Sequence, residues 1–304
     1  MSARIVEILK AFGAKLWQTP LLLGWLFAGL LLAFFREGWM GLALGAANLL
    51  IAGFYALIIH YQTQPPPAPE PVKRPALELA IALGLIGLLL VVQLLDFEVW
   101  GAQPWQGWVR GFFRGLGQAV YGLGFLPEWA KQDVYLAASS TIKQLLPALL
   151  IFLLFGYGWR AMGLSRPHWK LAGTLVGITS VFGLLTGVLT RAPLVQVLVL
   201  YAVGILVNAL PEELLFRGLL LSRLEAVFAN PLNALVVSAL IFNAIHLPID
   251  MANGRPLLAA LGDVFRISYT GLIWGCLYLR TRSILPGVLW HAANTQLGFI
   301  FLEF

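Results

Sequence analysis

The chain has 304 residues, of which 60% are hydrophobic and only 11% are charged. Soluble domains carry about 25% charged residues, so this composition places the chain in a lipid bilayer. The formal net charge of +6 does not indicate a nucleic-acid partner, because the basic residues form no strip with interleaved aromatic residues.

Nine segments approach the roughly 20 apolar residues that a membrane-spanning helix needs. Their apolar runs are continuous rather than alternating, which favours helices over a β-barrel. We expect an all-α, polytopic integral membrane protein with about eight or nine transmembrane helices. The candidate spans are residues 20–35, 41–61, 76–95, 141–158, 171–190, 193–209, 231–247, 259–279 and 284–302.

Residues 1–75 are interpreted as an interfacial helix, a two-helix hairpin and a proline-rich linker. Apolar and basic residues recur at helical spacing in residues 3–17, which is typical of a helix lying on the membrane or of a cytoplasmic extension of the first span. The prolines of residues 62–75 favour an extended linker.

Residues 76–140 are interpreted as one transmembrane helix followed by an external loop with short interfacial helices. This loop contains four tryptophans, Trp100, Trp105, Trp108 and Trp129. Tryptophans of this density suit the headgroup region of a bilayer. Residues 141–304 hold the remaining spans.

The basic residues near the predicted helix ends favour a cytoplasmic N-terminus in the cell (inner) membrane, by the positive-inside rule. This orientation makes a larger group of basic residues internal than external. The internal group is Arg4, Lys10, Lys15, Lys73, Arg74, Arg160, Arg166, Lys170, Arg280 and Arg282, and the external group is Arg36, Arg110, Arg114, Lys131, Arg191 and Arg255.

Two glycine pairs, Gly41 with Gly45 and Gly271 with Gly275, lie four residues apart within predicted spans. Such pairs allow close contact between helices. They do not define an oligomeric state.

Two adjacent glutamates, Glu212 and Glu213, follow Pro211 and precede Arg217 in an apolar stretch. Because residues i and i+4 share a helix face, Glu213 can pair with Arg217, whereas Glu212 points elsewhere. Glu212 is therefore the candidate working carboxylate, since a poorly solvated glutamate is a better base near neutral pH. In the competing interpretation, all three residues cap and anchor a helix at the membrane interface.

Of the four histidines, His246 and His291 lie in the predicted spans 231–247 and 284–302, and His60 lies at the end of the span 41–61. Intramembrane ionisable residues usually face the protein interior or a wet cavity. With Glu212 these first two histidines could activate water, and Asn294 and Thr295 could donate hydrogen bonds to an oxyanion. Each histidine could instead be a packing residue.

Two further features are interpreted as structural. Asp263 and Arg266 are spaced for a local ion pair, and Cys276, the only cysteine, is expected to fill space within a helix. The chain has no His-Glu-x-x-His, Gly-x-Ser-x-Gly or Walker motif, so these common catalytic centres are excluded.

Taken in order, the Glu212-Glu213-x-x-x-Arg217 motif, Phe242 four residues before His246, and His291 near Asn294 resemble the CAAX-protease and bacteriocin-processing family of intramembrane endopeptidases. Type II CAAX prenyl endopeptidases belong to this family. The resemblance covers about residues 195–300 and implies that residues 141–304 form a helical CAAX-protease-like core, with its site near the cytoplasmic membrane face.

The resemblance also implies roles for these residues. Glu212 would activate water with help from His246, Glu213 and Arg217 would support the site, and His291 with an amide side chain would hold the oxyanion. The last family motif places Asn four residues after His, but here that position is Thr295 and the amide is Asn294.

The sequence leads to an intramembrane endopeptidase that cuts a peptide or protein substrate, which could carry a lipid. We expect no cofactor, although Glu212, His246 and His291 would also suit a zinc site. The alternatives are a non-catalytic scaffold or immunity-type protein of the same fold and a proton-coupled transporter. The absence of a visible internal repeat in the sequence counts against the transporter.

Overall fold

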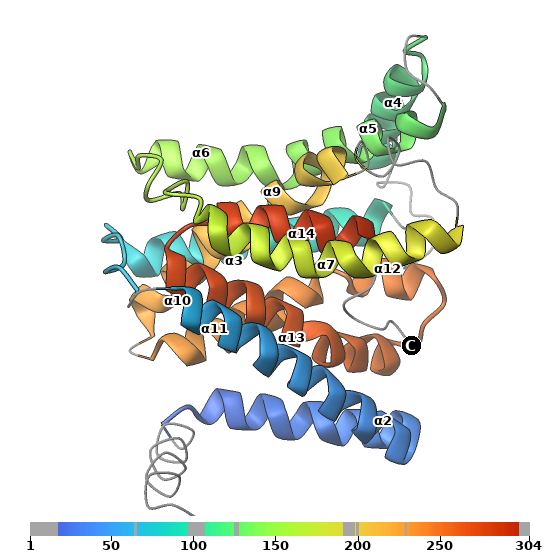
Figure 1. The fold of residues 1–304 in the computed structure, drawn as a ribbon. Coiled ribbons are helices and arrows are strands. Elements are labelled where there is room, and N and C mark those ends of the chain that lie inside the picture. The colour runs from blue at the N-terminus through green and yellow to red at the C-terminus, as the bar shows by residue number, and fades with distance from the viewer. Residues whose placement is uncertain are drawn as a thin grey trace, which may run out of the picture.

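The computed structural model describes residues 18–63, 66–96, 107–124, 128–190, 198, 201–228 and 230–297, and all regular elements within them are helices (Figure 1). The all-α prediction is confirmed for these ranges. The predicted interfacial helix at residues 3–17 lies outside them. So do most of the first half of the predicted span 193–209 and the end of the span 284–302.

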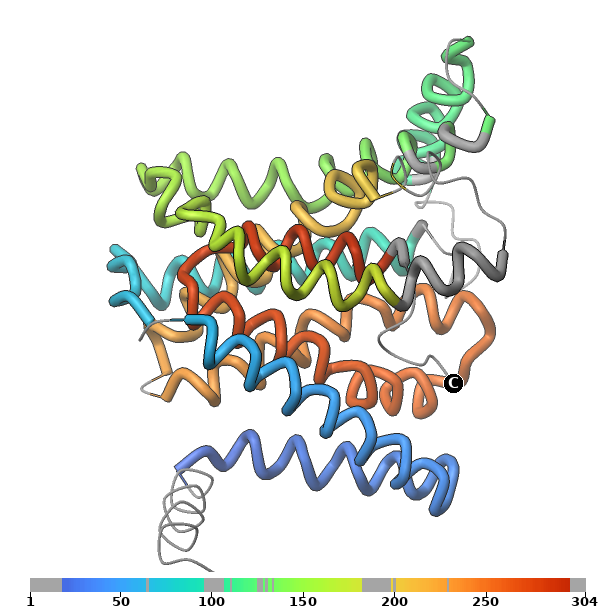
Figure 2. Tube along the Cα trace, in the orientation of Figure 1, coloured from blue at the N-terminus to red at the C-terminus, as the bar shows by residue number. Residues whose placement is uncertain are grey.

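The first element, α2 (Pro20–Gln62), is a hairpin of two helical arms rather than one rod. Its chain reverses in Figure 2, and Gly38 at the reversal has φ 60° and ψ −139°. A residue with a side chain rarely adopts this conformation. A Cβ on Gly41 would lie 2.0 Å from the Ala33 carbonyl oxygen, so the glycine lets the arms touch. The predicted spans 20–35 and 41–61 are these two arms.

The next helices run to the middle of the chain. Helix α4 is short and amphipathic, which suits the interfacial position predicted for it. Helix α5, in contrast, continues without a break through η2 into α6. The predicted span 141–158 therefore begins earlier and ends at Leu154. The bounds are α3 (Pro75–Asp96), α4 (Gly107–Tyr121), α5 (Glu128–Ser140), η2 (Thr141–Leu145), α6 (Leu146–Leu154) and α7 (Trp169–Thr190).

The second half of the chain forms the centre of the bundle. Its elements are η3 (Ile205–Ala209), α9 (Leu210–Glu212), η4 (Glu213–Leu221), α10 (Ser222–Val227), α11 (Pro231–Ala244), α12 (Leu247–Ala252), α13 (Leu257–Thr281) and α14 (Leu285–Leu297).

Several helices are long and apolar enough to cross a membrane, which makes this a multi-pass membrane protein. Within the described residues five segments meet that standard: Pro20–Gln62, Pro75–Leu95, Val134–Leu154, Pro231–Ala252 and Leu257–Thr281. Because the first is a hairpin, its two arms could cross separately. The total of eight or nine crossings stays a prediction.

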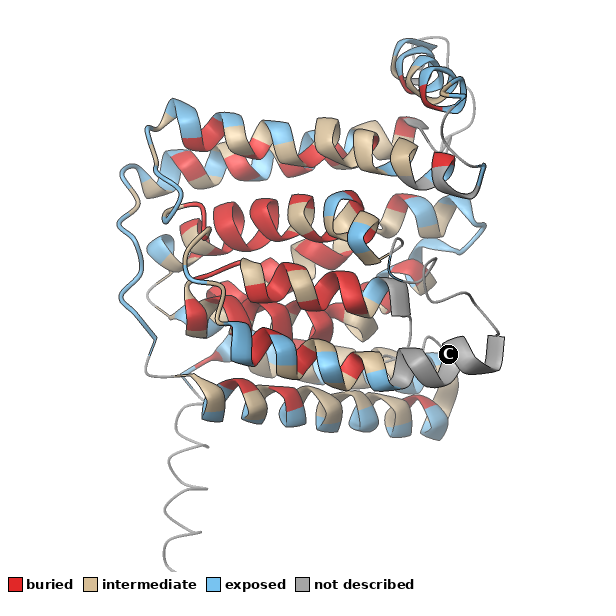
Figure 3. Ribbon diagram, turned by 45° about the horizontal axis from the view of Figure 1, so that its top comes forward, coloured by how far each residue is buried: buried red, intermediate tan, exposed pale blue. Residues whose placement is uncertain are grey.

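Residues 201–227 form a continuous helical segment that the hydropathy pattern did not predict beyond residue 209. The winding is of the wide π type in η3 and η4. All nine residues of η4 are buried, including Glu213 and Arg217, and the most buried helices of Figure 3 lie at the centre of the bundle. These charges lower the apparent hydropathy, but they neutralise each other inside the protein.

Helices α11 and α13 pack closely through glycine. A Cβ on Gly271 would lie 3.0 Å from Ala239, and one on Gly275 would lie 2.3 Å from Leu235 Cδ1. The predicted close contact at these glycines is therefore confirmed, and it is a contact within the chain.

One end of the bundle gathers basic residues that the sequence analysis assigned to the inside. Arg280 Nε donates to Thr63 Oγ1 over 2.9 Å, Arg282 pairs with Glu225, and Lys73 Nζ donates to the Phe155 carbonyl. Arg36 and Arg255, assigned to the outside, meet at Asp263. The two groups are thus separated as expected, whereas the orientation in the membrane stays a prediction.

A buried ion pair joins α3 to α10 at this basic end. Glu78 is fully buried and accepts hydrogen bonds from Arg223 Nε (3.0 Å) and Nη2 (2.9 Å), from the Tyr157 hydroxyl (2.7 Å) and from the Arg74 backbone N–H (3.0 Å). Each oxygen of the carboxylate is satisfied, so the pair can hold the two helices together without an orphaned charge.

We predict that Arg223→Ala destabilises the fold by about 3–5 kcal/mol, because it leaves the Glu78 carboxylate buried without its cation. Thermal unfolding of the purified protein in detergent measures this. The double variant Glu78→Leu with Arg223→Met removes both charges and should recover most of the loss. An unchanged midpoint in Arg223→Ala would show that the pair does not support the fold.

Candidate active site

The site is organised around the buried carboxylate of Glu213. Its Oε1 lies 3.2 Å from Arg217 Nη1 and 3.1 Å from His291 Nδ1, and all three side chains are almost completely buried. The predicted i, i+4 ion pair is present, but the sequence did not predict that Glu213 also holds His291. The segment 201–227 and α14 thus meet at one carboxylate.

The arginine is fixed by more than its ion pair. Its guanidinium lies 4.2 Å from the centre of the Phe242 ring and 5.5 Å from that of Trp274, and Nη2 donates to the Gly271 carbonyl over 3.5 Å. Such cation–π contacts are strongest where water is excluded. Arg217 therefore joins α11 and α13 to η4 in addition to neutralising Glu213.

Glu212 occupies a different environment from its neighbour. Its side chain is 12% exposed, against 1% for Glu213, and its Oε2 lies 3.7 Å from His291 Nε2. That distance is beyond hydrogen-bond range but close enough for electrostatic attraction. The predicted division between a fixed glutamate and a more accessible one agrees with this geometry.

His291 lies between the two glutamates and against an aromatic wall. The Trp274 ring stacks on it with 3.9 Å between centroids and 21° between planes, and Phe242 meets it edge-on at 6.1 Å. If Glu213 accepts the Nδ1 proton, Nε2 is the nitrogen directed at Glu212, since the partner of one ring nitrogen fixes the role of the other. Trp274 was not identified from the sequence, because only the fold brings it to His291.

His246 shares this aromatic wall but not the ion-pair cluster. Its ring is 5.9 Å from that of Phe242, and its Nδ1 is buried without a hydrogen-bond partner. Among the described residues it makes no polar contact with Glu212. His246, expected to help Glu212 activate water, is therefore not in direct contact with it, and Phe242 lies against both imidazoles.

Asn294 and Thr295, the two candidate oxyanion residues after His291, differ in their hydrogen bonds. Asn294 Oδ1 is buried without a hydrogen-bond partner. The hydroxyl of Thr295, an exposed residue, donates to the His291 carbonyl over 3.0 Å, within its own helix. Of the two, Asn294 is the residue whose amide remains available inside the protein.

Unpartnered polar atoms concentrate in this region. Eight buried side-chain nitrogen or oxygen atoms of the described residues have no hydrogen-bond partner, and five of them belong to the residues discussed here. One of the five, Arg217 Nη1, is ion-paired with Glu213. The other four are Glu213 Oε2, His246 Nδ1, Trp274 Nε1 and Asn294 Oδ1. Buried polar atoms are nearly always paired, so these four indicate a place for a ligand or water.

The metal alternative does not fit these donors. Among the described residues, which include all three proposed ligands, no three His, Cys, Asp or Glu side chains gather in a way that could hold a metal ion. Glu212 and His291 approach each other, but His246 stands apart across Phe242. No step is therefore assigned to zinc.

Comparison with family models gives a match over residues 194–297 to the family described as "Type II CAAX prenyl endopeptidase Rce1-like". This segment of the chain is therefore similar to the CAAX protease family. It contains all the site residues described above and about a third of the chain. Comparison with curated proteins gives no match, and comparison with solved structures gives none either.

A glycine of the matched segment, Gly287, lies close against the Glu213 carboxylate. A Cβ added to Gly287 would be 3.0 Å from Glu213 Oε2 and 3.4 Å from Cδ. The carboxylate cannot move aside easily, because Arg217 and His291 hold its other oxygen. The Leu285-Pro286-Gly287 sequence gave no sign of this role.

We predict that Gly287→Ala destabilises the protein by about 1–3 kcal/mol through overpacking against this carboxylate. The thermal midpoint in detergent is the measurement. Gly84→Ala in α3 is the matched control, because a Cβ there meets nothing within 4 Å and alanine favours the helix. Equal midpoints for the two variants would contradict the close contact at Gly287.

Proposed function

We propose that the chain is an intramembrane endopeptidase in which Glu212 activates water for attack on a peptide bond. The observation that carries this proposal is the accessible glutamate beside a fixed imidazole, within a cluster of buried polar atoms that lack partners. The match to the CAAX protease family supports the same chemistry.

In the proposed reaction, Glu212 removes a proton from water as the water oxygen bonds to the peptide carbonyl carbon. The carbonyl oxygen becomes an oxyanion, and the tetrahedral intermediate then collapses with cleavage of the C–N bond. Glu212 returns the proton to the departing amine, so the products are a carboxylic acid and an amine. The base and later acid is therefore one residue.

The other residues of the site hold the His291 ring in place and supply polar groups for the water or the oxyanion. Glu213, Arg217 and Trp274 hold His291 with its Nε2 toward Glu212. The unpartnered Nδ1 of His246 and amide oxygen of Asn294 are groups that could bind the water, and a donor at either position could bind the oxyanion. A rotation of 180° about χ2 exchanges the amide oxygen and nitrogen of Asn294, so its donor can be turned inward. Thr295 is assigned no direct role.

The substrate class follows from the family match and from the site's location within the membrane. We propose a membrane-associated peptide or protein, with a lipidated carboxy-terminal peptide as the first to be tried. A buried site with hydrophobic walls favours a substrate that is already in the bilayer.

We predict that Glu212→Gln lowers the cleavage rate by about 10²–10⁴-fold, because the amide cannot accept the proton of water. The assay is cleavage of a prenylated carboxy-terminal peptide by the full-length protein in liposomes. Glu70→Gln, in the exposed linker, removes one charge elsewhere and should leave the rate unchanged.

Retention of full cleavage in Glu212→Gln would overturn the assignment of the base. If the wild type cleaves no such peptide and the Gln variant keeps its cellular phenotype, the scaffold or immunity-type alternative takes its place. Proton-coupled uptake into vesicles that Glu212→Gln abolishes would favour the transporter.

We further predict that dialysis against a strong chelator leaves cleavage unchanged, because Glu212, His246 and His291 do not converge on one point. The rate before and after dialysis is compared, with and without added zinc. Loss of activity that zinc restores would contradict this arrangement of the three side chains.

A further inference from the structure

The Trp274 ring of α13 sets the plane of the His291 imidazole. The two rings stack with 3.9 Å between centroids and 21° between planes. Trp274 Nε1 is buried, and no group of the described residues accepts a hydrogen bond from it. The orientation of this indole therefore depends on the groups packed around it. These include Phe242 (5.9 Å), Trp290 (6.4 Å) and the guanidinium of Arg217 (5.5 Å).

Trp290, in turn, is held by two side chains outside the matched segment. It is fully buried and meets the Trp274 ring edge-on, with 88° between planes. Its Nε1 donates to Thr179 Oγ1 in α7 over 3.0 Å, and the ring of Tyr55 in α2 lies 4.7 Å from its own ring. A chain of contacts thus runs from α2 and α7 to the imidazole of His291.

The Thr179 hydroxyl is oriented for its hydrogen bond with Trp290. Thr179 is completely buried, and its Oγ1 donates to the Leu175 carbonyl one turn earlier over 3.0 Å. A hydroxyl has one donor and two lone pairs, so its remaining capacity is to accept. The N–H of Trp290 uses that capacity. Loss of the hydroxyl would leave a buried indole N–H unsatisfied, which is more unfavourable than the net value of the bond itself.

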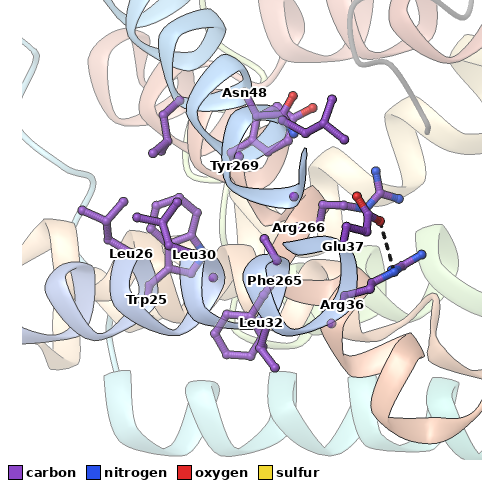
Figure 4. Close-up of a pocket in the computed structure, with 17 residues that line it drawn as sticks. Trp25, Leu26, Leu30, Leu32, Arg36, Glu37, Asn48, Phe265, Arg266 and Tyr269 are labelled. Carbon is purple, nitrogen blue, oxygen red and sulfur yellow. Dashed lines mark ion pairs between the residues drawn. The ribbon is translucent and has the colours of Figure 1, made fainter. Parts of the chain in front are cut away.

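The Tyr55 ring also has a fixed position. It is only 2% exposed. The hairpin that carries it is held to α13, where Trp25 Nε1 donates to Ser268 Oγ over 2.5 Å. The two arms and α13 enclose a narrow pocket, shown in Figure 4, whose walls include Trp25, Leu26, Phe265 and Tyr269. The hairpin is therefore packed against the bundle, and the Tyr55 ring restrains the ring of Trp290.

We propose that Tyr55 and Thr179 are positioning residues of the active site. Through the two tryptophans they hold the imidazole in the plane in which His291 Nε2 lies 3.7 Å from Glu212 Oε2. This role rests on the proposed function, in which Glu212 works beside a fixed imidazole. Neither positioning residue touches the reacting groups. The helices that precede the matched segment then contribute to the chemistry and not only to the membrane-spanning bundle.

Two variants test the hydrogen bond to Trp290. Thr179→Val keeps the shape of the side chain and removes the hydroxyl, whereas Thr179→Ser keeps the hydroxyl. In cleavage of a prenylated peptide by the full-length protein in liposomes, Thr179→Val should lower kcat by about tenfold or more, because small displacements of catalytic groups are costly. KM should change by less than about twofold, since binding of the ground state is unaffected. Thr179→Ser should recover most of the rate.

A second pair of variants tests the ring of Tyr55. Tyr55→Leu removes the aromatic contact and should lower kcat as Thr179→Val does, whereas Tyr55→Phe keeps the ring and should recover most of the rate. Ile59→Ala is the control, because Ile59 is fully buried one turn later on the same arm and has no ring to place against Trp290. Thermal midpoints in detergent should fall in both Tyr55→Leu and Ile59→Ala, but Ile59→Ala should keep the wild-type kcat.

The position of the imidazole is measured independently of activity by ¹⁵N NMR of histidine-labelled protein in liposomes. The His291 signals are assigned by their loss in His291→Gln. We expect a single set of His291 signals in the wild type, Thr179→Ser and Tyr55→Phe, and shifted or broadened signals in Thr179→Val and Tyr55→Leu. A purely structural role in the fold would lower the thermal midpoints without moving these signals.

The outcomes separate this proposal from the proposed function. If the wild type cleaves no peptide, or Glu212→Gln cleaves equally fast, the proposed function fails, and the His291 signals alone decide whether Tyr55 and Thr179 hold the ring. Where the wild type cleaves, the proposal requires both changes in folded Thr179→Val and Tyr55→Leu. A wild-type kcat, or unchanged His291 signals, in either variant would overturn it. An equal loss of kcat in Ile59→Ala would also overturn it.

Discussion

The packing at the centre of the bundle depends on how one buried carboxylate, that of Glu213, is neutralised. Glu213 is 1% exposed within the bilayer-spanning bundle, where an unpaired charge is prohibitively unfavourable. Arg217 neutralises it from one turn along the same helix, and His291 adds a second partner from α14. Gly287 allows the approach, and the aromatic rings of Phe242 and Trp274 cover the arginine. The central packing of η4, α11, α13 and α14 follows from these contacts.

Neutralising the buried charge of Glu213 leaves the adjacent glutamates, Glu212 and Glu213, in different environments. Glu213 pairs with Arg217 and His291, and these contacts together with the stacked Trp274 ring hold the imidazole in place. Glu212, one residue earlier, makes no ion pair with the arginine, is more accessible and lies 3.7 Å from the other nitrogen of that imidazole. In the proposed mechanism both glutamates are needed, because a single carboxylate could not hold the ring and also exchange a proton with water.

Contacts between residues close together in the sequence could be predicted, whereas contacts between distant residues could not. The Glu213–Arg217 pair and the α2 hairpin follow from local spacing and from glycine, and the sequence predicted both. The contacts of Trp274 and Gly287 depend on helices far apart in the chain, so no local pattern indicated them. Of the two histidines expected near Glu212, His291 approaches it and His246 makes no direct polar contact with it, and Phe242 lies against both imidazoles.

The predicted orientation in the membrane depends on basic residues that also make contacts within the fold. The positive-inside rule treats each Lys or Arg as a free signal at a helix end. Here several serve the fold: Arg282 pairs with Glu225, Arg280 donates to Thr63, and Lys73 donates to the Phe155 carbonyl. At the opposite end, Arg36, Arg255 and Arg266 gather around the buried Asp263. Because basic residues at both ends are paired, a count of Lys and Arg alone overstates the charge difference on which the predicted orientation depends.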